Sequence, residues 1–119
     1  MSDGECLRHA FEEMMRRDER GEKVVYVQGT VTNPHTGKTF AHAWVENTRE
    51  AIDPTIDLIL PKRKYYSTFK PEKVIRLEPA VAALLILKYK HKFFPKAEAE
   101  ATAETVRKYE ESLRKRKQS

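Results

Sequence analysis

Residues 40–46 (FAHAWVE) constrain the fold more than any other part of this 119-residue chain. Larger side chains alternate with Ala or Val there, so Phe40, His42 and Trp44 fall on one side. Such a period of two is typical of a β-strand with unlike faces. Asp53 follows eleven residues after His42, beyond a short polar stretch. The sequence therefore predicts two adjoining strands that bring a histidine and an aspartate together.

The other elements follow from apolar periodicity and from residues that favour turns. The predicted strands cover residues 23–32, 38–46, 51–53, 65–69 and 73–77. The predicted helices begin near Gly4, Ala80 and Lys96. The first should end within 18–22, the second near residue 92, before Pro95, and the third near 116.

These elements predict an α+β fold: an N-terminal helix packed on a small antiparallel sheet, followed by two C-terminal helices. Residues 1–95 would form the core with its trailing helix, and residues 96–119 a charged C-terminal helix. The thin apolar stripe of that last helix could pack on the domain or on a second copy, which would give a homo-oligomer.

Composition limits the classes of function. Hydrophobic residues make up 39% and charged residues 34% of the chain, and the longest apolar run is too short to span a bilayer, so we expect no membrane partner. A single cysteine cannot form an internal disulfide, which suits a reducing compartment, and we expect a cytoplasmic protein. The net charge of +5 predicts weak polyanion binding through the basic C-terminal region. A solvated basic surface is favoured over a dedicated nucleic-acid site. The basic and aromatic residues 89–93 could belong to a nucleic-acid surface, but an ordinary helix end is favoured for them.

Three residues have the chemistry of a nucleophile, a base and an orienting acid. Cys6 is expected in the first turn of the first helix, where the helix dipole favours a thiolate. His42 could accept the thiol proton and later donate it to a leaving amine. Asp53 would hold the ring in one tautomer and stabilise its charged form.

Each of these residues also has a commoner structural role. A lone cysteine is usually a small buried hydrophobe, and an aspartate before a proline is usually a turn residue. Trp44 is expected to be a core anchor rather than a substrate platform. Glu46 is expected to face solvent or to pair with a nearby Lys or Arg. Zinc ligands could come from Cys6, His9, His35 and His42, but no CxxC or HxxxH pattern is present, and no metal or cofactor is expected.

The segment GECLRHAFEEMMRRDERGEKVVYVQGTV, followed by FAHAWVE and IDPT, resembles the transglutaminase-like branch of the papain-like cysteine-enzyme superfamily. The matching motifs lie at residues 4–6, 26–29, 42–46 and 53–55, so the resemblance covers about residues 4–55. It implies a Cys–His–Asp triad in a papain-like α+β core. The activities it implies are peptide and amide hydrolysis, deglycosylation of glycopeptides, leader-peptide processing and acyl transfer to amines.

The chain departs from that family's pattern before the cysteine, because only five residues precede Cys6. In papain-like relatives a side chain upstream of the cysteine helps to form the oxyanion hole. Here the backbone N–H of Cys6 could supply one donor, and Gln28 and Trp44 are candidates for another. Losing one such donor typically costs about 10²–10³ in rate.

Two functions follow as hypotheses. The first is a cysteine-dependent hydrolase or acyltransferase that acts on an amide of a peptide or protein through a thioester. The alternative is a catalytically inactive binding module, which could be associated with nucleic acid.

Overall fold

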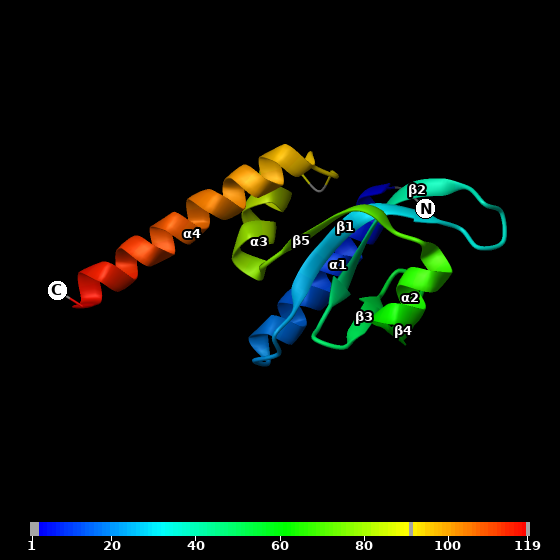
Figure 1. Ribbon diagram of the computed structural model, residues 1–119, viewed down its shortest axis with the longest axis horizontal. Helices are drawn as coiled ribbons and strands as arrows, with labels where there is room; N and C mark the ends of the chain where they lie inside the picture. The colour runs from blue at the N-terminus through cyan, green and yellow to red at the C-terminus, as the bar shows by residue number, and fades with distance from the viewer. Residues whose placement is uncertain (1–2, 91, 119) are drawn as a thin grey trace.

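A five-stranded antiparallel sheet with helices on both faces forms the body of the protein (Figure 1). The computed structural model describes residues 3–90 and 92–118. The strands follow the order β4-β3-β2-β1-β5, and each neighbouring pair is antiparallel. The elements are α1 (Asp3–Glu19), β1 (Val25–Thr32), β2 (Thr39–Glu46), β3 (Glu50–Asp53), β4 (Leu58–Pro61), α2 (Lys62–Phe69), β5 (Glu72–Leu77), α3 (Pro79–Lys88) and α4 (Lys96–Gln118). The expected α+β class and antiparallel sheet are confirmed.

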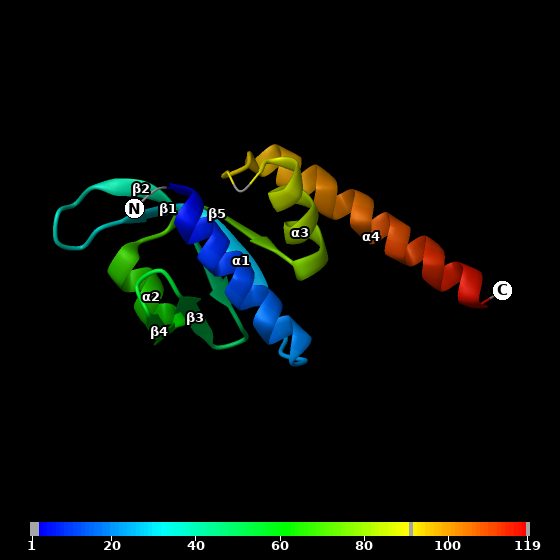
Figure 2. The same ribbon diagram turned by 180° about the vertical axis from the view of Figure 1, so that it is seen from behind.

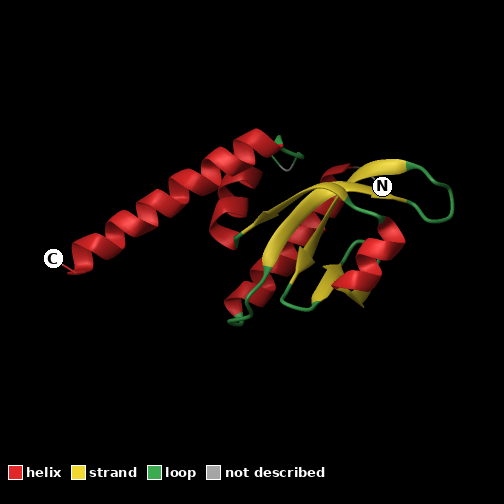
Figure 3. Cartoon of the chain, in the orientation of Figure 1, coloured by secondary structure: helices red, strands yellow, loops and turns green. Residues whose placement is uncertain are grey.

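The register of the β1–β2 hairpin decides which side chains share a face. Val27 lies opposite Trp44 and Gly29 lies opposite His42, while Tyr26 lies opposite Val45. Because side chains alternate along a strand, His42 and Trp44 point to one face and Val45 to the other. Figure 2 shows α1 in front of the sheet, and Figure 3 shows the red helices on either side of the yellow strands.

Two apolar clusters hold these layers together. The larger one joins α1 and α3 to one face of the sheet and includes Leu7, Met14, Val45 and Leu85. The smaller one joins α2 to the opposite face. It comprises Val27, Val31, Trp44, Ala51 and Tyr65. Burial of apolar surface on both faces is the main force that fixes the sheet between the helices.

The strand expected at 65–69 is wrong, because α2 occupies these residues. Its β-branched and aromatic composition favours a strand locally, but Tyr65 and Phe69 are four residues apart and share one side of a helix. Tyr65 is fully buried in the smaller cluster, and Phe69 packs against it with ring centroids 4.8 Å apart. Tertiary packing therefore overrides local propensity here. The edge strand β4 was not predicted at all.

The two C-terminal helices form as expected, but they end at other residues than predicted. The expected helix over 80–92 ends at Lys88, and His91 lies outside the described residues. Ala99, near the start of α4, is buried in the larger cluster, and Lys88 forms an ion pair with Glu98. Ala103 and Val106 also pack against this cluster, and beyond them α4 extends away from the sheet (Figure 1). None of the helices in the described ranges has the length and apolarity needed to cross a membrane.

Candidate active site

The strands β2 and β3 bring His42 and Asp53 into direct contact. The Nε2 atom of His42 lies 2.7 Å from Oδ2 of Asp53, and both side chains are buried. The register pairs Val45 with Ile52, and continuing it by one residue sets Asp53 opposite Trp44. His42 and Asp53 are thus diagonal neighbours on one face. The Cα atoms of such neighbours are roughly 7–8 Å apart, so that long side chains can meet.

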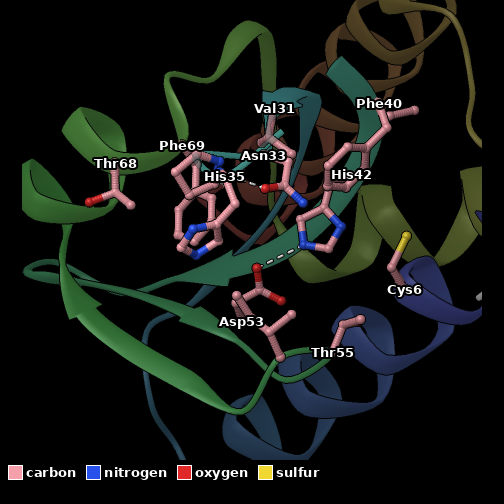
Figure 4. A pocket seen from close by; sticks show the side chains of 13 residues that line it. Cys6, Val31, Asn33, His35, Phe40, His42, Asp53, Thr55, Thr68 and Phe69 are labelled. Atoms are coloured by element: carbon pink, nitrogen blue, oxygen red, sulfur yellow. Dashed lines mark hydrogen bonds and ion pairs between the residues drawn. The ribbon is translucent and has the colours of Figure 1, made fainter. Parts of the chain in front are cut away.

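Cys6 lies on the other side of the same imidazole. The first turn of α1 carries it to the wall of a cavity that His42 and Asp53 also line. Figure 4 shows the His42 ring between Asp53 and Cys6. Burial lowers the pKa of His42, but hydrogen bonds to Asp53 and Cys6 and the charges of these two groups more than offset this and raise the pKa to about 9. These contacts favour the imidazolium form of the ring beside the sulfur.

Tyr65 of α2 is a member of this site that sequence reasoning missed. Its hydroxyl donates a hydrogen bond of 2.8 Å to Oδ2 of Asp53, the same oxygen that contacts His42. Oδ1 of Asp53 is buried and has no hydrogen-bond partner among the described residues. Burial, together with the charge and hydrogen bond of Asp53, raises the pKa of Tyr65, so the phenol stays a donor. The i, i+4 spacing of Tyr65 and Phe69 was the signal that could have revealed it.

The cavity has a volume of about 530 Å³. It extends from Cys6 along the α2 face of the hairpin to the hairpin tip and α2 (Figure 4). Its lining combines the three candidate residues with apolar side chains and a few polar ones. The wall residues beyond Cys6, His42 and Asp53 are Val31, Asn33, Pro34, His35, Phe40, Ala41, Thr55, Ile56, Thr68 and Phe69. Its size is typical of small-ligand sites, which are roughly 300–1,000 Å³.

The structure does not bring Gln28 and Trp44, the candidates for an oxyanion donor, to this cavity. Gln28 lies on the opposite face of the sheet, where its Nε2 donates to the backbone oxygen of Phe94 at 2.8 Å. Trp44 is fully buried, and its Nε1 donates to Glu46 at 2.9 Å. Trp44 also stacks with His42, with ring centroids 6.1 Å apart, so it supports the imidazole as a core side chain.

Glu46 is buried rather than solvent-facing, which corrects one of the two expectations for this residue. Its Oε2 accepts hydrogen bonds from Trp44 and, at 2.6 Å, from the Tyr66 hydroxyl. Its Oε1 accepts one of 3.0 Å from Arg76 of β5. The carboxylate is satisfied by three donors from β2, α2 and β5. The expected pairing with a basic residue is present. It links β5 to β2, the strand that carries His42.

The structure does not gather the candidate zinc ligands into one site. His9 contacts Thr55, with 3.4 Å between Nδ1 and Oγ1, and His35 is exposed at the hairpin tip. The described ranges contain no group of three or more His, Cys, Asp or Glu side chains that could hold a metal ion.

A comparison with protein-family models, curated proteins and solved structures finds no match to this chain. Fold and site define an α+β protein with a cysteine, a histidine and an aspartate in one cavity.

Proposed function

We propose that the chain is a cysteine-dependent enzyme that cleaves or transfers the acyl group of an amide. The observation that carries this proposal is the placement of the His42 ring between the Cys6 side chain and the Asp53 carboxylate. An imidazolium beside the sulfur stabilises a thiolate, which is the nucleophilic form. The buried Asp53 favours the charged ring and keeps Nε2 engaged, so the other ring nitrogen serves the reacting atoms.

The reaction proceeds in two balanced halves. The Cys6 thiolate forms a C–S bond to the amide carbonyl carbon, the C–N bond then breaks, and the leaving amine takes a proton from His42. Water or a second amine next attacks the thioester and gives a proton to His42 as the new C–O or C–N bond forms and the C–S bond breaks. The thiolate and imidazolium are thereby restored. Hydrolysis and acyl transfer differ only in the acceptor.

We further propose that the core is of the papain and transglutaminase-like kind. The supporting features are the order of the elements and the positions of the three residues: cysteine in the first turn of a helix, histidine on the second strand and aspartate on the third. The cytoplasm is the proposed location, because a single cysteine that acts as a thiol suits a reducing compartment.

Alkylation of Cys6 by iodoacetamide across pH tests the proposal. The native protein should react faster than a free thiol below pH 7, because the thiolate is the reactive species. His42→Ala should remove this advantage. His9→Ala, which removes an imidazole one helical turn from Cys6, is the matched control and should keep it. Reaction no faster than a free thiol in both the native and His42→Ala proteins would refute the proposal.

A binding module for polyanions is the second candidate function. The last turn of α4 carries Lys115, Arg116 and Lys117, all exposed, at the end that projects from the domain. Binding to RNA or DNA that weakens steeply with salt and survives Cys6→Ala would support this function. Absence of binding at moderate salt would exclude it.

A further inference from the structure

The cavity beside Cys6 has walls that the catalytic chemistry does not require. Four large apolar side chains line it: two from the β1–β2 hairpin, one from the β3–β4 turn and one from α2. They are Val31, Phe40, Ile56 and Phe69. Ile56 and Phe69 lie beyond residue 55, where the sequence resemblance ends. The walls that Ile56 and Phe69 form are therefore not implied by the resemblance.

Charged side chains are few in the wall of this cavity. Apart from Cys6 and His42, its titratable lining in the described ranges is Asp53 and His35. Asp53 is 1% exposed, and its oxygen Oδ2 is already used by His42 and Tyr65. No Lys, Arg or Glu of the described chain lines the cavity. A charged acyl substituent placed against Val31, Ile56 and Phe69 would exchange water for apolar side chains, which is costly.

The apolar walls are partly open to solvent. Phe40 is 44% exposed and Ile56 is 48% exposed, although both lie beside buried catalytic candidates. Large apolar surface left open at the mouth of a concave site is typical of a ligand-binding surface. An apolar substituent on a carbonyl held at Cys6 would cover both side chains.

We propose that this cavity selects substrates whose acyl group carries a large uncharged apolar substituent, such as the side chain of Leu, Met or Phe. This specificity rests on the proposed function, because the acyl group must be transferred to Cys6. The substituent lies against Val31, Phe40, Ile56 and Phe69 while the carbonyl faces the sulfur. Small acyl groups leave the walls uncovered, and an anionic end placed against these apolar walls loses its water at a cost.

A series of p-nitrophenyl esters tests the selection. Acetyl, hexanoyl and glutaryl esters compare a small, a large apolar and an anionic acyl group. The rate of nitrophenolate release, divided by the rate with free cysteine to remove intrinsic reactivity, is measured for the native protein and for Cys6→Ala. The native rate with hexanoyl ester should exceed the rates with acetyl and glutaryl esters by about tenfold or more. Cys6→Ala should release nitrophenolate from each ester no faster than buffer alone, and this background rate is subtracted from the native rate.

Two isoleucines of similar exposure provide the matched variants. Ile56 lines the cavity, whereas Ile59 of β4 is 52% exposed and lies outside its lining. Ile56→Ala should reduce the hexanoyl preference several-fold, and Ile56→Lys should raise the relative glutaryl rate. Ile59→Ala should change neither ratio.

The possible failures are distinguishable. Release that depends on Cys6 but is as fast with acetyl or glutaryl as with hexanoyl ester would overturn the selection and leave the proposed function standing. An equal effect of the two isoleucine variants would also overturn the selection. If none of the esters shows nitrophenolate release that depends on Cys6, the proposed function is overturned, and the selection with it.

Discussion

Replacing Tyr65 with Phe removes one buried hydrogen bond and little else. The hydroxyl donates to Oδ2 of Asp53 at 2.8 Å, and both side chains are almost fully buried. The ring itself packs against Trp44, with centroids 5.2 Å apart, and Phe preserves that contact. Since Oδ1 of Asp53 has no hydrogen-bond partner in the described chain, the carboxylate is left with one donor instead of two.

The expected loss of stability follows from the charge of the acceptor. Hydrogen bonds to charged groups contribute about 1.5–3 kcal/mol, and burial keeps solvent from replacing this one. With an m-value in urea of about 1–3 kcal/mol per molar, the midpoint of unfolding should fall by roughly 1 M. Far-UV circular dichroism gives the transition without depending on Trp44, which neighbours the changed ring.

Tyr109→Phe is the matched control, because Tyr109 is 64% exposed on α4. It should leave the midpoint unchanged. If Tyr65→Phe were as stable as this control, the hydrogen bond that positions Asp53 would contribute nothing, and the account of Tyr65 as a member of the site would be refuted.

Three further predictions concern residues on three strands of the sheet, β1, β2 and β5. The pKa of His42 is about 9 in the folded protein, above its usual value of about 6.5, so its stabilisation is complete below pH 6.5 and is lost as pH rises through 9. The unfolding free energy of the native protein minus that of His42→Gln should therefore fall by an amount on the order of 3 kcal/mol between pH 6 and pH 10; parallel pH profiles would contradict this. Gly29→Ala should destabilise by about 1–3 kcal/mol in thermal unfolding, because the new Cβ would lie 3.0 Å from a backbone oxygen of β5, and a neutral result would mean that β5 yields freely. Arg76→Gln should cost about 1–2 kcal/mol in urea unfolding, allowing for the half-exposed guanidinium, because it deprives the buried Glu46 of a donor. The exposed Arg107→Gln should have no measurable effect, and equal effects of the two arginine variants would argue against a role for burial.

Much of the fold could be predicted because its signals are local. Alternation along β2 and turn residues such as Asn33 and Asn47, whose side chains accept backbone hydrogen bonds, define the first three strands. The exposed edge strand β4 and the helix α2 were missed, since neither has a strong pattern of its own. The apolar side of α2 is buried by packing on Trp44 and Val27, which lie far away in sequence.

Part of the candidate site could likewise be predicted from local signals, and part depended on contacts between distant residues. His42 and Asp53 could be paired in advance, because only a short turn separates their strands. Gln28 could not be excluded, because the face on which it lies depends on the register of β1 against β2. The burial of Glu46 likewise depends on donors from α2 and β5, none of which a local pattern indicates.

The sequence by itself determined the strand that carries the imidazole, the helix that carries the sulfur and the short link to the carboxylate, because periodicity and turn chemistry act between near neighbours. Only the tertiary structure decided that α1 brings Cys6 to His42, that Tyr65 holds Asp53 and that apolar side chains line the space beside them. These contacts join residues that are distant along the chain, and they form only when both faces of the sheet bury their apolar side chains.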